Sequence, residues 1–227
     1  MIKAVIFDMF ETLVTLFVGR TYFSENIAED LGVDIKEFKK PWHEIEWDRS
    51  TGKYSTEEAL EMTMKKLGVY SEESLNKVFN KRHDALMDTF TNISEDSIKL
   101  LEGLKERGIK IGLITNTFSD ERDLIRDSIL FPYFDVALIS YEQGLCKPDL
   151  ELYRRMAEQL GVKMDECMYV GDGGSKELYA AREVGMHPVQ CTWFHDLAFE
   201  PHIPCPILDE FEQAAHQTDI LKMAENG

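Results

Sequence analysis

The stretch MIKAVIFDMFETLV, residues 1–14, begins with an apolar run that ends at a carboxylate. Residues 2–7 are mostly β-branched or aromatic, and the run is too short for a helix, so it predicts a buried β-strand. Asp8 ends this strand. A carboxylate at the end of a buried strand costs free energy unless it is paired, bound to a ligand or solvated in a cleft. Asp8 is therefore a candidate functional residue.

Farther along the chain, apolar runs alternate with helical patterns. The runs that predict strands are IKIGLIT (109–115), FDVALIS (134–140), ECMYVGD (166–172) and HPVQCTW (187–193). The segments that predict helices are 94–108, 119–130, 147–161, 174–185 and a final helix from Asp209. Strands that alternate with helices imply right-handed crossovers. The sequence thus predicts an α/β fold, a parallel sheet with helices on both faces that also contains the opening strand.

A block of helical patterns without a convincing strand interrupts this alternation. One of them, STEEALEMTMKKLG (55–68), has a Ser/Thr start, an acidic first turn and a Gly stop. Because the block follows the first strand directly, we expect an all-helical domain of residues 15–88. It would be inserted into a discontinuous core of residues 1–14 and 89–227.

Charge and cysteine content limit the partners and the compartment. The chain has 25 Lys and Arg against 42 Asp and Glu, a formal net charge of -17. This balance argues against nucleic acid and anionic membranes as partners. A small anionic substrate is still compatible with the acidic chain, because a local metal ion or lysine can attract it. The four cysteines form no CxxC pair, and no secretory or transmembrane pattern is visible, which predicts a cytoplasmic protein with reduced thiols. The sequence does not indicate an oligomeric state.

Polar or charged residues follow four of the predicted strands. They are Asp8, Thr115 with Asn116, Lys147 after a short loop, and Asp172. Each alone has an ordinary interpretation as a cap, a turn or a solvated residue. Because ligands collect beyond the carboxyl ends of parallel strands, the conjunction predicts a common site.

The residue types fit phosphoryl transfer. Asp8 can act as a nucleophile that forms an aspartyl-phosphate. Asp8, Asp172 and Glu177 would repel one another unless a divalent cation lies between them, and Mg²⁺ suits oxygen ligands. The Thr115 hydroxyl can bind phosphate oxygens, while Lys147 offsets charge on nucleophile and phosphate.

Four segments resemble the motifs of the haloacid dehalogenase superfamily. They are FDMFETL (7–13), LITN (113–116), CKPD (146–149) and VGDGGSKEL (170–178). Members of that superfamily are mostly Mg²⁺-dependent phosphatases on a Rossmann-like core, and the resemblance extends over essentially the whole chain. It implies that the helical insertion is a C1 cap of the subfamily I type, which closes over the active site and selects a small phosphomonoester.

The resemblance also implies roles for individual residues. These are Asp8 as nucleophile, Lys147 as stabilising cation, Thr115 and Asn116 as phosphate-binding residues, and Asp8, Asp172, Glu177 and the backbone carbonyl of Phe10 as Mg²⁺ ligands.

Phe10 departs from the usual D-x-D-G-T form, in which the second Asp protonates the leaving group and later activates water. A phenyl ring cannot transfer a proton, and adjacent residues of an extended segment point to opposite sides, which disfavours Glu11 as a substitute. Three functions stay open: a phosphatase without the usual acid, a metal-independent haloacid dehalogenase, and a weakly active or non-catalytic protein that binds phosphate or Mg²⁺ for regulation. The acidic pair in VGDGGSKEL favours the phosphatase.

The expected cap contains two candidate residues for substrate selection. Arg49 and Lys53 flank Gly52 in WDRSTGKYS (47–55), which predicts a loop between helices. A cation in such a loop can reach a polar substrate group when a cap closes. The alternative is that both are ordinary solvated charges.

Overall fold

Six strands form one sheet in the order β3-β2-β1-β4-β5-β6, and every neighbouring pair is parallel. They are β1 (Ala4–Phe7), β2 (Lys110–Thr115), β3 (Val136–Ile139), β4 (Cys167–Gly171), β5 (His187–Cys191) and β6 (Glu212–Ala214). The computed structural model describes residues 1–226. The predicted α/β fold is confirmed. Since β1 lies between β2 and β4, the carboxyl end of β1 is at the point where the strand order reverses, which is where such sheets bind ligands.

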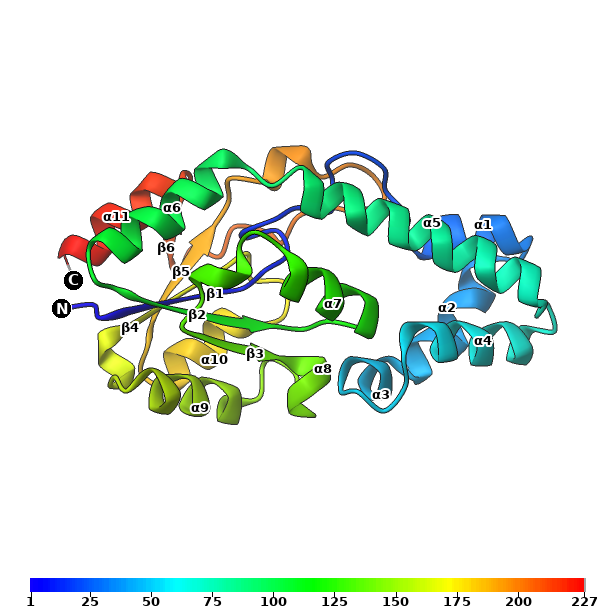
Figure 1. The fold of residues 1–227 in the computed structure, drawn as a ribbon, viewed down its shortest axis with the longest axis horizontal. Coiled ribbons are helices and arrows are strands. Elements are labelled where there is room, and N and C mark those ends of the chain that lie inside the picture. Colours follow the sequence, from blue (N-terminus) through cyan, green and yellow to red (C-terminus); the bar gives the residue numbers. More distant parts are fainter. Residues whose placement is uncertain (227) are drawn as a thin grey trace.

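Helices cover both faces of the sheet. Those of the sheet domain are α6 (Glu95–Glu106), α7 (Ser119–Asp127), α8 (Ser140–Gln143), α9 (Leu150–Leu160), α10 (Glu177–Glu183) and α11 (Gln217–Asn226). Three short 3₁₀ segments are η1 (Phe131–Tyr133), η2 (Met164–Glu166) and η3 (His195–Leu197). In Figure 1, α6 and α11 lie over one face, and α9 and α10 over the other.

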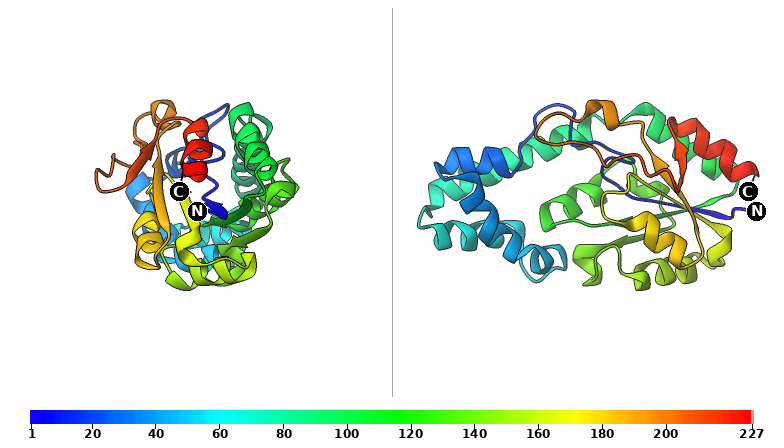
Figure 2. Two further views of the ribbon diagram at one scale, coloured as in Figure 1. Left: turned by 90° about the vertical axis from the view of Figure 1, so that its left-hand side faces the viewer. Right: turned by 180° about the vertical axis from the view of Figure 1, so that it is seen from behind.

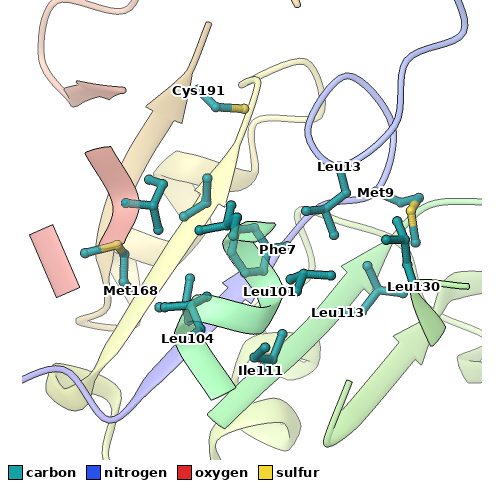
Figure 3. Close-up of a cluster of buried hydrophobic side chains, with 14 of the residues drawn as sticks. Phe7, Met9, Leu13, Leu101, Leu104, Ile111, Leu113, Leu130, Met168 and Cys191 are labelled. Carbon is teal, nitrogen blue, oxygen red and sulfur yellow. The ribbon is translucent and has the colours of Figure 1, made fainter. Parts of the chain in front are cut away.

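The first strand is apolar on both faces because both are covered. Val5 and Phe7 belong to the core beneath α6 and α11, whereas Ala4 and Ile6 belong to the core beneath α9 and α10. Figure 3 shows Phe7 within the first of these cores. A strand buried on both sides reads as a continuous apolar run rather than an alternation, as the sequence does here.

Residues 24–91 form five helices and no strand, and we call them the helical bundle. The helices are α1 (Ser24–Leu31), α2 (Ile35–Glu44), α3 (Glu46–Ser50), α4 (Thr56–Leu67) and α5 (Glu72–Thr91). The bundle has a core of its own, which includes Phe38, Trp42 and Leu60. It lies at the end of the molecule opposite the two termini (Figures 1 and 2). The boundary expected at residue 88 falls inside α5.

Three elements differ from the sequence prediction. The final helix begins at Gln217 rather than near Asp209, and residues 212–214 form the edge strand β6. This strand is three residues long and mostly polar, so its pairing with β5 determines it rather than any local pattern. Ser140, expected at the end of a strand, begins the short helix α8.

Within residues 1–226, none of the helices has both the length and the hydropathy that crossing a bilayer requires.

Candidate active site

Asp8 and Lys147 form a buried ion pair at the carboxyl end of the sheet. Asp8 follows β1, and its Oδ1 lies 2.7 Å from Lys147 Nζ. The two side chains are 9% and 1% exposed, respectively. The same oxygen accepts a hydrogen bond of 2.7 Å from the backbone N–H of Met9. These contacts fix the orientation of the Asp8 carboxylate.

Two further carboxylates lie beside Asp8. Asp172 follows β4, the neighbour of β1, and Glu177 begins α10. One carboxylate oxygen of each of the three residues lies within 4.8 Å of the others. We call Asp8, Asp172 and Glu177 the acidic cluster. The sequence predicted that these three residues converge, and the geometry brings them together.

The loop between Asp172 and Glu177 orients both carboxylates. Glu177 accepts hydrogen bonds of 2.7 Å from the backbone N–H groups of Gly173 and Ser175, and Asp172 accepts one of 3.0 Å from Gly174. Gly173 has a φ of +100°, and a Cβ there would lie 3.0 Å from Cys205 Sγ. The position therefore requires glycine.

The acidic cluster carries more negative charge than Lys147 can balance. Burial, together with the charges of Asp8 and Glu177, raises the pKa of Asp172 to about 7. Burial also raises the pKa of Asp8, and the positive charge of Lys147 only partly offsets this rise. Burial would lower the pKa of Lys147, but the charges of Asp8 and Glu177 outweigh it and hold that pKa above the usual value. Oriented, charge-rich oxygen ligands of this kind fit a divalent cation.

Thr115 and Asn116, at the end of β2, differ in their hydrogen bonding. Thr115 is buried, and its Oγ1 has no hydrogen-bond partner among residues 1–226. The Asn116 side chain instead holds the backbone of Lys147: its Oδ1 accepts from Lys147 N at 2.8 Å, and its Nδ2 donates to Lys147 O at 3.2 Å. Asn116 thus positions the segment that carries the lysine.

The Phe10 side chain packs against other apolar side chains. Its ring contacts the core beneath α6 and lies edge-on to Phe90, with the ring centroids 6.2 Å apart. Glu11 has a φ of 53°, so the backbone here is not extended and the alternation assumed from the sequence does not apply. The Glu11 carboxylate accepts hydrogen bonds from Leu16 N and Thr15 Oγ1, which ties it to the loop that follows.

A cavity of about 400 Å³ adjoins the acidic cluster. Asp172 and Glu11 lie on its wall, and most of the remaining lining is apolar or aromatic. It includes Phe17 and Phe23, which precede the helical bundle, and His195 and His202 from the segment after β5. The cavity has room for a small organic molecule next to the carboxylates.

The two cations expected in one loop of the helical bundle lie in different environments. Arg49 belongs to helix α3 rather than to a loop, and it is buried. Lys53 is exposed and pairs with Asp48 at 2.7 Å. Of these two cations, only Arg49 therefore lies in the interior of the molecule.

Sequence reasoning missed two polar residues that support the site. Gln190 is fully buried on β5, and its Nε2 donates to the backbone carbonyl of Asp172 at 2.8 Å. Ser140 Oγ accepts from Thr117 N at 2.9 Å and donates to Ser50 O at 2.8 Å, which joins the sheet domain to the helical bundle. The available signals were a glutamine within the predicted strand 187–193 and a serine at the end of the predicted strand 134–140.

The fold and the site define a Rossmann-like α/β protein with a cluster of carboxylates at the topological switch point. The chain belongs to the haloacid dehalogenase-like hydrolase family, whose sequence model matches residues 2–185, and the protein is a hydrolase. The glyceraldehyde 3-phosphate phosphatase of Methanocaldococcus jannaschii is 30% identical over 84% of this chain and 85% of that protein.

Solved structures share the fold at lower identity. The 2-haloacid dehalogenase from Pseudomonas syringae pv. Tomato DC3000 matches with a TM-score of 0.69 and 20% sequence identity. This match covers 100% of this chain and 99% of the dehalogenase chain. A haloacid dehalogenase family enzyme from Bacteroides thetaiotaomicron, solved with magnesium and inorganic phosphate, matches with a TM-score of 0.61 and 18% sequence identity. This match covers 85% of this chain and 95% of the enzyme's chain.

Proposed function

We propose that this protein is a Mg²⁺-dependent phosphatase that hydrolyses a small phosphorylated metabolite through an aspartyl-phosphate on Asp8. The acidic cluster carries the proposal, because its carboxylate oxygens lie within 4.8 Å of one another and Lys147 is their one ion-pair partner in the described chain. A dehalogenase that uses no metal has no need of Asp172 and Glu177. The phosphatase name of the Methanocaldococcus jannaschii relative supports the same assignment.

Asp8, Asp172 and Glu177 would hold Mg²⁺ together with the backbone carbonyl of Phe10. The bound ion would neutralise charge on the nucleophile and on the phosphate. The raised pKa of Asp172 fits this role, because it reflects repulsion that a cation would relieve. The magnesium and phosphate in the Bacteroides thetaiotaomicron enzyme are consistent with the choice of ion.

In the first half-reaction, an Asp8 oxygen attacks phosphorus and the bond to the leaving-group oxygen breaks. Lys147, the Thr115 hydroxyl and the backbone N–H of Asn116 would bind the phosphoryl oxygens. In the second half-reaction, water attacks the phosphorus, releases inorganic phosphate and restores the Asp8 carboxylate. The unpartnered Thr115 Oγ1 supports this assignment, because a buried hydroxyl normally has a partner.

Phe10 leaves both half-reactions without the usual acid and base. General acid–base catalysis contributes about 10²- to 10⁴-fold, so its loss matters most for poor alkoxide leaving groups. The leaving group would take its proton from solvent. We therefore propose that phosphate esters of acidic alcohols or phenols react fastest.

The helical bundle, residues 24–91, would serve as the cap, inserted between the first strand and the rest of the α/β core. Arg82 of α5 binds Asp120 at 2.7 Å and Glu121 at 2.6 Å, both at the start of α7. These contacts hold the bundle against the sheet domain. A small phosphomonoester would bind between the helical bundle and the sheet domain.

The test uses 4-nitrophenyl phosphate, which has a good leaving group. We expect hydrolysis by the purified protein with Mg²⁺, none with excess chelator, and none by the Asp8→Asn variant. Halide release from 2-haloacids without metal would contradict the proposal and establish the dehalogenase. Absence of turnover in both assays, with Mg²⁺-dependent binding of orthovanadate, would instead establish the regulatory function.

A further inference from the structure

The cavity of about 400 Å³ beside the acidic cluster joins a carboxylate to an apolar wall. Asp172 is one of its lining residues, so the cavity reaches the acidic cluster directly. Most of the remaining lining consists of aromatic, proline and aliphatic side chains, which we call the apolar wall. The volume lies in the range of sites that hold small organic ligands. A molecule bound at the acidic cluster can therefore extend along the apolar wall.

Two segments far apart in the sequence build the apolar wall. One lies between the first strand and α1, within residues 16–23, and the other follows β5, within residues 194–205. The ring centroids of Phe17 and Phe199 are 5.5 Å apart, and those of Phe23 and His202 are 4.0 Å apart. The two segments, dark blue and orange, lie side by side in Figures 1 and 2. These ring contacts hold the wall together although neither segment contains an α-helix or a strand.

Several side chains of the apolar wall are open to solvent. Ile203 is 74% exposed, and Phe17 and Phe23 are half-buried. Such side chains contribute little to the core of the folded chain. They lose their contact with water when a ligand enters the cavity, and removal of apolar surface from water favours binding. The wall therefore fits an apolar group.

His195 adds an uncharged polar group to the lining. Its Nε2 is buried and has no hydrogen-bond partner among residues 1–226, which a buried polar atom normally has. The other lining histidine, His202, stacks on Phe23 and has its Nε2 3.5 Å from Glu25 Oε2. Burial lowers the pKa of His195 below its usual value, so its imidazole is neutral at neutral pH. A neutral imidazole nitrogen can pair with a hydroxyl group, which both donates and accepts.

The residue types favour a planar aromatic ligand over a flexible chain. Phe17, Phe23 and Phe194 all line the cavity, and aromatic side chains pair with other rings in stacked or edge-on arrangements. The chemistry points in the same direction. With Phe10 in place of the usual acid, a phenol leaves more readily than an alkyl alcohol.

We propose that this cavity binds the leaving group of the substrate, a phenol with a fused aromatic ring and a second hydroxyl that pairs with His195 Nε2. The inference rests on the proposed phosphatase function and adds the substrate class. The phosphoryl group passes to Asp8 as the bond between phosphorus and the phenolic oxygen breaks. The phenolate takes a proton from solvent, and water then releases phosphate from Asp8. His195 acts as a specificity-determining residue, since the chemistry occurs at Asp8.

The first test compares phenyl phosphate with 2-naphthyl phosphate, whose leaving groups are similar in acidity but differ in apolar area. We expect kcat/KM of the native protein to be about tenfold higher for 2-naphthyl phosphate, because the second ring buries additional apolar surface. Ala198 lines the cavity, so Ala198→Trp places a large side chain in the space of that ring. This variant should lower the ratio of the two kcat/KM values by about tenfold.

Ala215→Trp is the matched control, because Ala215 is exposed and does not line this cavity. It should leave the ratio between the two substrates unchanged. The inference is wrong if the native protein hydrolyses both substrates equally well. It is also wrong if Ala198→Trp lowers both kcat/KM values by the same factor, since that result indicates a general disturbance of the site.

A binding measurement separates this inference from the phosphatase proposal. Fluorescence titration with 2-naphthol needs neither metal nor turnover, and Ala198→Trp should weaken this binding by about tenfold. At least one of 2,6- and 2,7-dihydroxynaphthalene should bind the native protein about 3- to 10-fold more tightly than 2-naphthol, the range expected for one hydrogen bond. His195→Leu, which keeps an apolar surface, should abolish this gain.

Each variant alone can overturn part of the inference. Unchanged 2-naphthol binding in Ala198→Trp would exclude the cavity as the ring site. A second hydroxyl that gives no gain, or the same gain in His195→Leu, would exclude the pairing with His195. If 4-nitrophenyl phosphate is not hydrolysed, the phosphatase proposal fails, but the naphthol titrations still test the cavity.

Discussion

Lys147 Nζ lies 2.7 Å from Asp8 Oδ1, and both side chains are buried where β1 ends. Within residues 1–226, neither Asp172 nor Glu177 forms an ion pair with a cationic side chain. One lysine thus faces three carboxylates. This imbalance connects the fold, which brings the strand ends together, to the metal-dependent chemistry that we propose.

Replacing Lys147 by Met should abolish most of the activity. The substitution leaves Asp8 buried without its partner, and breaking a buried pair in this way destabilises a protein by about 3–5 kcal/mol. Loss of a charge that stabilises the transition state lowers kcat by about 100- to 1,000-fold. Urea denaturation and 4-nitrophenyl phosphate hydrolysis measure the two effects. Near-native activity in Lys147→Met would exclude Lys147 from catalysis.

Phe10→Asp should restore a proton donor and acceptor near the leaving group. We expect the ratio of kcat/KM for an alkyl phosphate to that for an aryl phosphate to rise by about 10- to 100-fold. The loss of the contact with Phe90 and the neighbouring core should lower the free energy of unfolding by about 2–4 kcal/mol. Phe10→Leu, which adds no carboxyl, is the control. An unchanged ratio would mean that another group already supplies the proton.

Mg²⁺ should stabilise the folded protein more strongly as the pH rises through about 7. The pKa of Asp172 is raised to about 7 in the folded protein from 3.8. A carboxyl with a raised folded pKa favours the folded state at low pH, and this contribution is lost as the pH rises through the folded value. The ionised cluster is also the form that binds the cation. Thermal unfolding with and without Mg²⁺ from about pH 5.5 to about pH 8.5 measures this change.

Asp172→Asn should remove most of the Mg²⁺ stabilisation and its dependence on pH. A Mg²⁺ effect of equal size in this variant, or one that decreases as the pH rises, would contradict the assignment of the acidic cluster as the metal site.

Arg82→Met should loosen the boundary between the helical bundle and the sheet domain. Arg82 is buried between Asp120 and Glu121, so its removal leaves two carboxylates uncompensated and should cost about 3–5 kcal/mol. Arg20→Met removes an exposed arginine with two partners of its own and should cost about 1 kcal/mol or less. Urea denaturation compares the two variants. Equal losses would show that Arg82 does not hold the boundary.

The sequence predicted the parts of the site that depend on local pattern. A strand-like run with a polar residue at its end is visible without a structure, and parallel strands bring such ends together. Asp8, Lys147 and Asp172 could therefore be expected in one place. The apolar opening strand likewise indicated a sheet covered on both faces.

The environments that arise from distant segments could not be predicted in this way. Arg49 has the sequence context of a surface charge, and its burial depends on Phe118, far along the chain. The edge strand β6 has no apolar alternation and exists through its pairing with β5. The turn of the backbone at Glu11, with its positive φ, has no glycine or asparagine to indicate it.

Rapid mixing of the protein with 4-nitrophenyl phosphate and Mg²⁺ tests the central claim most directly. Because Phe10 cannot activate water, the phosphorylated form of Asp8 should accumulate. We predict a burst of nitrophenol close to one equivalent of protein, and acid-quenched samples with a phosphoryl group on the peptide that contains Asp8. Hydrolysis without a burst and without phosphoryl on this peptide would contradict the aspartyl-phosphate mechanism.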